Sequence, residues 1–332
     1  MMYLFLIGVL FLGWSFGRNN LSNVFGTAIG TRMVSFHSAA ILAAVFIVLG
    51  ALFSSGKTTD AMRVLATVSF IQGAFWVSLS IALTFLFANR FGVPVSTVQS
   101  SVGALIGWNL FFHAPNNWPV IREMIGAWFY CPLVAILLAM IIFYLTRFLL
   151  QHIRIPLLYR DFGIRILLIV SGIYTSYFLG ANNMPAVAGP YLNVDGLNAF
   201  GLICLASIFV AIGILMADKR VISTMSSGLY PLSPMEALVV VFSCGLTLYC
   251  FSGTGLKALL QYLNLPVFPL VPIPTSSILA GSIVGVGLVK GRSAIKLGSL
   301  AKIVSSWFWI PIISGLICYV ILFIFIREGI AL

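Results

Sequence analysis

Ten apolar segments follow one another along this chain, and they constrain its fold more than any other feature. Only 8% of the 332 residues are charged and 61% are hydrophobic, whereas a soluble domain is about 25% charged. The sequence therefore predicts an all-α, polytopic membrane protein with about ten transmembrane or re-entrant segments. These segments are residues 1–16, 36–54, 64–88, 96–112, 122–148, 164–179, 197–217, 234–256, 276–289 and 300–326.

The basic residues predict how the segments are oriented. Arg147, Arg154, Arg160 and Arg165 cluster around the central loop, and basic residues collect in cytoplasmic loops. We therefore expect a multi-pass protein of the cell membrane with this loop in the cytoplasm and both termini outside. Arg18 is expected at a membrane boundary, where a long side chain reaches the interface. The lipid bilayer is thus the expected partner. Nucleic acid is not, because no basic run alternates with aromatic residues.

Three sequence landmarks occur twice, in the same order. GRNNLSNVFGT (Gly17–Thr27) and GANNMPAVAGP (Gly180–Pro190) share a Gly-x-Asn-Asn-x5-Gly skeleton at an offset of 163. PVSTVQSSVGALIGWNL (Pro94–Leu110) aligns without gaps to PIPTSSILAGSIVGVGL (Pro272–Leu288) at an offset of 178. The third pair, WFYCP and WFWIP, has an offset of 179. The second half has therefore gained roughly 16 residues between landmarks, the difference between those offsets.

This repetition predicts two halves of opposite orientation. With five segments each, an odd number, the halves enter the membrane in opposite senses, which is the inverted-repeat plan of secondary transporters. We predict a first repeat over residues 1–150, a cytoplasmic linker over 151–163 and a second repeat over 164–332.

Four of the apolar segments are shorter than the roughly 20 residues that a straight span needs. Each adjoins one of the polar landmark stretches, which is typical of broken or re-entrant helices. The four are 1–16, 96–112, 164–179 and 276–289.

The first two landmark pairs carry amides and hydroxyls but no carboxylate. We expect helix starts after them, so that free N–H groups and positive dipole ends converge near the midplane. Helix N-termini with hydroxyls bind phosphate-like groups. For single residues the alternatives are helix capping and, for the glycines, close helix packing. The predicted oxyanion site comprises Asn19, Asn20, Asn23, Thr27, Ser96, Thr97, Gln99, Asn182, Asn183, Thr275, Ser276 and Ser277.

These motifs resemble the inorganic phosphate transporter family, often called PiT, from Gly17 to Pro311. The resemblance implies a phosphate carrier built from inverted repeats, and a homodimer. The family signature usually reads Asn-Asp, with carboxylates associated with the coupling cation, usually sodium; Asn20 and Asn183 stand in their places. The coupling cation therefore stays open between H⁺ and Na⁺, and we expect no cofactor or bound metal. A subgroup that carries sulfate, with protons, also shows Asn-Asn in its second signature.

We therefore expect a symporter-type, secondary active carrier of inorganic phosphate that works by alternating access. A proton-coupled sulfate permease of the same family is the alternative. An anion channel, a carrier of small organic acids and a membrane-embedded transferase are further candidates. A transferase needs a carboxylate cluster for metal or a His/Asp pair. The motifs contain neither, so we expect that the chain is not an enzyme.

Overall fold

The computed structural model describes residues 2–90, 95–152, 156–217, 222–223, 230–291 and 295–327. These residues form helices and connecting turns, without a β-strand among them. The first half contains η1 (Met2–Leu6), α1 (Ile7–Gly30), α2 (Phe36–Ser54), α3 (Gly56–Leu65), α4 (Ile71–Arg90), α5 (Thr97–Phe111) and α6 (Trp118–His152). The second half contains α7 (Leu157–Ala188), η2 (Gly189–Tyr191), α8 (Ala199–Leu215), α10 (Pro234–Cys250), α11 (Thr254–Tyr262), α12 (Thr275–Lys290) and α13 (Leu297–Arg327).

Among the described residues, six helices are long and apolar enough to cross a membrane: α1, α2, α4, α6, α7 and α13, some counted with adjacent residues. A seventh span results if α10 and α11, which meet at a bend of 69°, are counted as one. The helices α8 and α12 are apolar but shorter. Large apolar side chains cover the outside of α6 and α13, where Leu133 and Ile312 are more than half exposed. Such a surface suits lipid, so the prediction of a multi-pass, all-helical membrane protein is confirmed.

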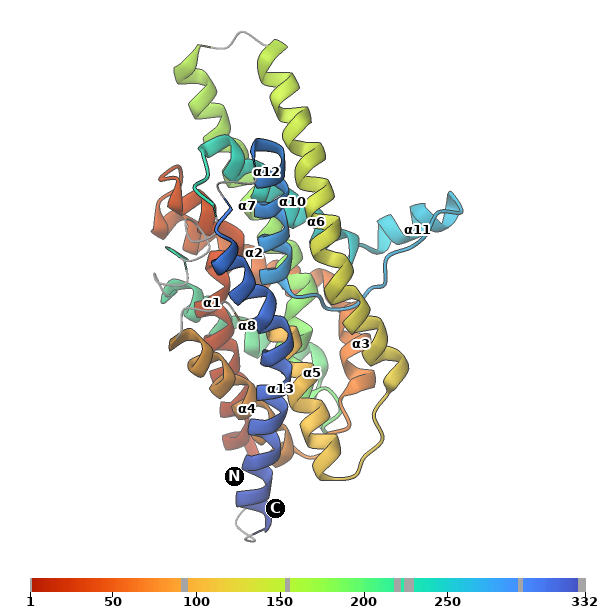
Figure 1. The fold of residues 1–332 in the computed structure, drawn as a ribbon. Coiled ribbons are helices and arrows are strands. Elements are labelled where there is room, and N and C mark those ends of the chain that lie inside the picture. Colours follow the sequence, from red (N-terminus) through yellow and green to blue (C-terminus); the bar gives the residue numbers. More distant parts are fainter. Residues whose placement is uncertain are drawn as a thin grey trace.

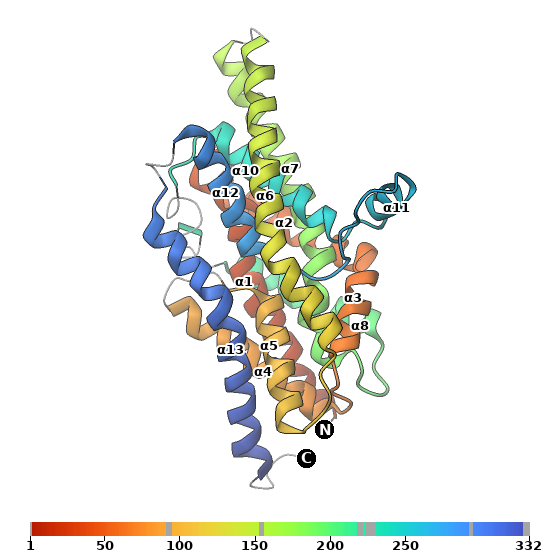
Figure 2. The same ribbon diagram turned by 45° about the vertical axis from the view of Figure 1, so that its right-hand side comes forward.

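The long helices form one bundle, and both chain ends lie at the same end of it (Figures 1 and 2). The end of α6 and the start of α7 extend beyond the rest of the bundle at the opposite end. The short helix α11 projects sideways from the bundle in both views. Inside the bundle, α5 packs along α13 and α12 packs along α6. Each of the short helices α5 and α12 thus rests on a long helix from the other half of the chain.

Two of the four expected helix breaks are wrong. Residues 7–16 of the first segment and the whole segment 164–179 belong to the longer helices α1 and α7, which continue through the two Asn-Asn stretches. Helix starts therefore do not follow these stretches. The physical reason is that Gly17 and Gly180 serve close packing: a Cβ on either would overlap a backbone carbonyl of α8 or α2. The other two breaks are confirmed, since α5 begins at Thr97 and α12 at Thr275. Pro94 lies outside the described residues.

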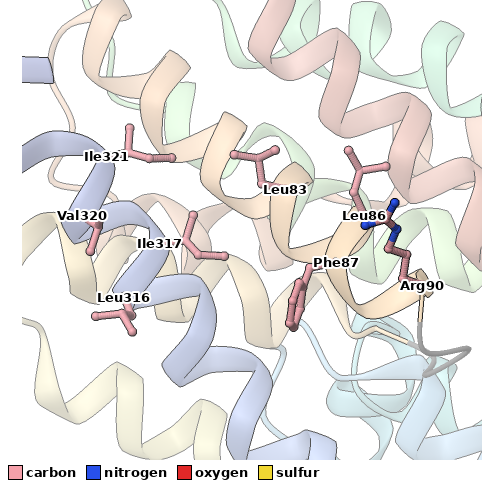
Figure 3. A pocket seen from close by; sticks show the side chains of 8 residues that line it. All are labelled: Leu83, Leu86, Phe87, Arg90, Leu316, Ile317, Val320 and Ile321. Carbon is pink, nitrogen blue, oxygen red and sulfur yellow. The ribbon is translucent and has the colours of Figure 1, made fainter. Parts of the chain in front are cut away.

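A wide groove of about 830 Å³ separates part of α4 from α13. Figure 3 shows its lining, in which leucine, isoleucine, valine and phenylalanine side chains lead to a single charged residue, Arg90, at one end. Because the lining is almost wholly apolar, the groove suits lipid chains and cannot bind a hydrated anion along its length. The polar residues singled out in the sequence lie elsewhere, inside the bundle.

Candidate oxyanion site

All twelve predicted site residues are buried, with exposures between 0 and 5%. They belong to four helices: α1, α7 and the first turns of α5 and α12, including the N-cap residue Ser96. Hydrogen bonds connect α1 with the segment that precedes α5, and α7 with the first turn of α12. Buried polar groups are normally hydrogen-bonded, so a cluster of this size in an apolar bundle calls for a partner for each group.

The first asparagine of each pair holds the extended segment that precedes a short helix. Asn19 donates from Nδ2 to the carbonyl oxygen of Val95, 2.9 Å away. Asn182 donates to the carbonyl of Val271 at 3.1 Å and accepts from the N–H of Ile273 at 2.8 Å. In each half, therefore, this amide fixes where the helix start lies. Because these amides already bond the backbone, they orient the short helices more than they offer donors to a ligand.

The second asparagines differ between the halves. Asn183 donates from Nδ2 to the hydroxyl of Thr275 at 2.7 Å, which joins α7 to the first turn of α12. Asn20 instead donates to the carbonyl of Phe16 and accepts from Asn23, both within α1. The site is therefore closed by a direct side-chain bond on the α12 side. On the α5 side, the corresponding amide is satisfied by its own helix.

Several predicted residues carry a buried polar atom with no hydrogen-bond partner in the described part of the chain. Among them are three hydroxyls and one amide nitrogen that can donate to an anion: Thr27 Oγ1, Thr97 Oγ1, Ser277 Oγ and Gln99 Nε2. The others are the amide oxygens of Asn19, Asn23 and Asn183, which can accept from water or from a protonated anion. A buried polar group without a hydrogen-bond partner destabilises the folded protein by about 1–3 kcal/mol. An oxyanion that accepts hydrogen bonds from these donors would remove that destabilisation.

The first turns of α5 and α12 add to this donor set. Ser96 caps α5, since its hydroxyl accepts from the N–H of Gln99 at 3.4 Å, so the capping alternative holds for this residue. Pro274 is the N-cap of α12 and offers no side-chain cap. The first N–H groups of a helix lack intrahelical partners and lie at the positive end of its dipole. Both helix starts therefore favour negative charge nearby.

Two further hydroxyls, outside the predicted site set, lie on the same two short helices. Ser101 donates to the carbonyl of Ala186 at 2.8 Å and so links α5 to α7, across the two halves. Ser282 is fully buried on α12, and its hydroxyl has no partner among the described groups. A sequence signal exists for it, because Ser282 follows Thr275 by seven positions and shares its helix face.

Charged groups lie apart from this cluster or are already engaged. Glu236 is 3% exposed, but it caps the start of α10 and pairs with Lys290 at 2.5 Å. Arg18 lies within α1, inside the apolar span Leu4–Gly30 and not at a helix end; it is half-buried, with its guanidinium 4.8 Å from the centre of the Trp14 ring. The reason is that α1 continues through the first Asn-Asn stretch instead of ending before it.

Comparisons with known proteins give the following similarities. The family model described as the phosphate transporter family matches residues 16–258. A protein named "Putative phosphate permease MJ0630" from Methanocaldococcus jannaschii is 27% identical over 318 residues, which is 95% of each chain. The sulfate permease CysP of Bacillus subtilis is 24% identical over 96% of this chain and 86% of its own. A solved structure titled as the sodium-dependent phosphate transporter has the same fold, with a TM-score of 0.76 at 20% identity, covering 96% of this chain and 98% of its own.

Proposed function

The chain belongs to the phosphate transporter family, and from this premise we propose that it is a secondary active carrier of inorganic phosphate, with sulfate as the alternative substrate. The carrier works by alternating access at the oxyanion site between α1, α5, α7 and α12. One observation carries the proposal: buried donors without protein partners gather beside the first turns of α5 and α12 in the described structure. Hydroxyl and amide donors at helix N-termini are the groups that bind tetrahedral oxyanions.

Each class of side chain has its own role in this proposal. Thr97, Gln99 and Ser277 donate to the anion oxygens, together with the first N–H groups of the two short helices. Asn19 and Asn182 hold the helix starts in place through the backbone bonds described above. Asn183 and Thr275 close the site from the α12 side. The donors are neutral, so they hold a dianion or a monoanion without requiring a specific protonation state.

Reciprocal packing supports an inverted repeat with halves 1–150 and 164–332, joined by the linker 151–163. Gly17 packs against Val210 of α8, and Gly180, its partner at an offset of 163, packs against Ile47 of α2. Ile47 and Val210 are themselves separated by 163 positions. The same contact is thus made twice with the halves exchanged, which is what a two-fold related pair of repeats requires. In the proposed orientation both termini lie outside; the homodimer also remains a prediction.

The absence of charged side chains from the proposed site bears on whether it can bind sulfate as well as phosphate. Asn20 and Asn183 place neutral amides where the family signature carries aspartates, so the site lacks two charges that would repel a dianion or attract sodium. A sulfate ion cannot donate a proton, and binding to the hydroxyl and amide donors of this site does not require the anion to carry one. We therefore include sulfate as a substrate of this site, and the relative with a sulfate-permease name is consistent with that.

Uptake by purified protein in liposomes tests the function. We expect labelled phosphate or sulfate to accumulate above its external concentration when a pH or sodium gradient is imposed, and each anion to compete with the other. Uptake at two pH values, with and without sodium, identifies the coupling cation. Equilibration without accumulation would instead indicate a channel, and uptake of an organic acid that neither anion inhibits would contradict the proposed substrate class.

A further inference from the structure

A polar cavity of about 540 Å³ lies where the end of α2, the start of α3, the second half of α7 and the bend between α10 and α11 meet. Its lining is unlike that of the apolar groove beside α4, because it combines one cation with several hydroxyls. Its polar side chains include those of Ser54, Lys57, Asp60 and Tyr177.

The walls of this cavity are bonded to the residues that flank the first asparagine of α7. Thr58, next to Lys57, donates its hydroxyl to the carbonyl of Ala181 at 2.7 Å. On the opposite wall, Asn182 donates to the carbonyl of Phe251 at 3.5 Å, and Phe251 directly precedes the lining residue Ser252. The backbone around Asn182 therefore joins the walls of this cavity to the buried amide cluster.

The polar groups of the cavity are available to an anion. Lys57 Nζ is 3.9 Å from Asp60 Oδ2, and the two side chains are 64% and 66% exposed. Such an exposed ion pair contributes little to the stability of the protein and is easily broken. Ser54 Oγ and Tyr177 OH share one hydrogen bond of 2.5 Å, which uses only one of their two protons. The second hydroxyl proton of this pair and the Lys57 ammonium group are therefore donors that the cavity lining can offer to an anion.

We propose that this cavity is a recruitment subsite, where a tetrahedral oxyanion binds before it enters the buried site. The inference rests on the proposed transport function and adds a binding site to it. The positive charge of Lys57 raises the local concentration of the anion, whereas the negative charge of Asp60 lowers it. The subsite is hydrated and holds the anion weakly, as an entry site must if the anion is to move on.

Removal of the positive charge of Lys57 and removal of the negative charge of Asp60 are expected to change KM in opposite directions. At low ionic strength, Lys57→Gln raises the KM for phosphate or sulfate uptake about fivefold, the effect of one charge at about 4 Å in water. Asp60→Asn lowers KM by a similar factor. Vmax stays unchanged in both variants, Lys57→Arg behaves like the wild type, and high salt removes both effects. Lys257→Gln, which removes the same charge from α11 outside this cavity, is the matched control and leaves KM unchanged.

The outcomes separate the subsite from the function itself. A wild-type protein that takes up neither anion contradicts the proposed function. Normal uptake by the wild type, with unchanged KM in both Lys57→Gln and Asp60→Asn, overturns the subsite alone. A fall in Vmax with unchanged KM also overturns it, because Lys57 would then act on the transport step or on folding. Thermal unfolding of each purified variant shows which of these two applies.

Discussion

Replacement of Thr97 by valine lowers the uptake of phosphate and sulfate by about 10- to 100-fold without lowering the stability of the protein. The Thr97 hydroxyl is buried at 2% exposure and has no partner in the described structure, so its removal breaks no bond within the protein. A hydrogen bond to a charged group contributes about 1.5–3 kcal/mol, and the anion loses that bond. Initial rates of labelled uptake in liposomes and thermal unfolding in detergent measure the two effects.

Thr84→Val is the matched control for this experiment. Thr84 is also fully buried, but its hydroxyl donates to the carbonyl of Ser80 within α4, at 2.8 Å. We expect near-normal uptake for this variant. If Thr97→Val transports both anions like the wild type, Thr97 does not bind them. If it unfolds at a lower temperature and loses uptake in proportion, the hydroxyl has a structural role instead.

The second large effect, on both stability and uptake, is expected at Gly103, which allows close packing between a helix of the first half and a helix of the second. A Cβ at Gly103 would overlap the backbone of Pro311, where α5 packs on α13. A backbone contact cannot be relieved by a side-chain rotation, so Gly103→Ala forces α5 away from α13. We expect an unfolding free energy lower by about 1–3 kcal/mol or more. We also expect loss of uptake, because the start of α5 moves with the helix.

Two further variants make this prediction specific. Gly281 meets Pro132 in the corresponding contact of α12 with α6, so Gly281→Ala should have an effect of similar size. Gly126 of α6 is the control, since a Cβ added there would have its nearest neighbour 3.6 Å away, on the flexible side chain of Tyr130. Gly126→Ala should unfold and transport normally. Wild-type stability of Gly103→Ala would contradict the packing of α5 on α13.

The sequence predicted the helix starts of α5 and α12 correctly because their signals are local. Proline and hydroxyl residues before an apolar run mark a helix N-terminus, and Ser96 acts as the N-cap. The Asn-Asn stretches misled the same argument. Asparagine and glycine weaken a helix locally, but the bonds that stabilise α1 and α7 here join Asn19 to Val95 and Asn182 to Val271. Such tertiary partners are not visible in local sequence.

The additional residues of the second half illustrate the same limit. The starts of α4 and α10, Ile71 and Pro234, still differ by 163 positions, whereas Val95 and Ile273 differ by 178. The extra residues therefore follow the start of α10, where α11 projects from the bundle without a buried residue. The sequence showed that residues had been gained. It placed them between the first two landmark pairs, whose offsets are 163 and 178, but no further, because α11 carries no repeated landmark.

Location of a bound anion by anomalous diffraction tests the central claim most directly. Selenate and arsenate are analogues of sulfate and phosphate whose heavy atoms can be located in crystals of the protein. We predict that the strongest anomalous peak lies between the starts of α5 and α12, within hydrogen-bond reach of Thr97 Oγ1 and Gln99 Nε2. Absence of a peak there, at a concentration that inhibits uptake, with the amides of α1 and α7 packed dry and away from any bound anion, would contradict the account.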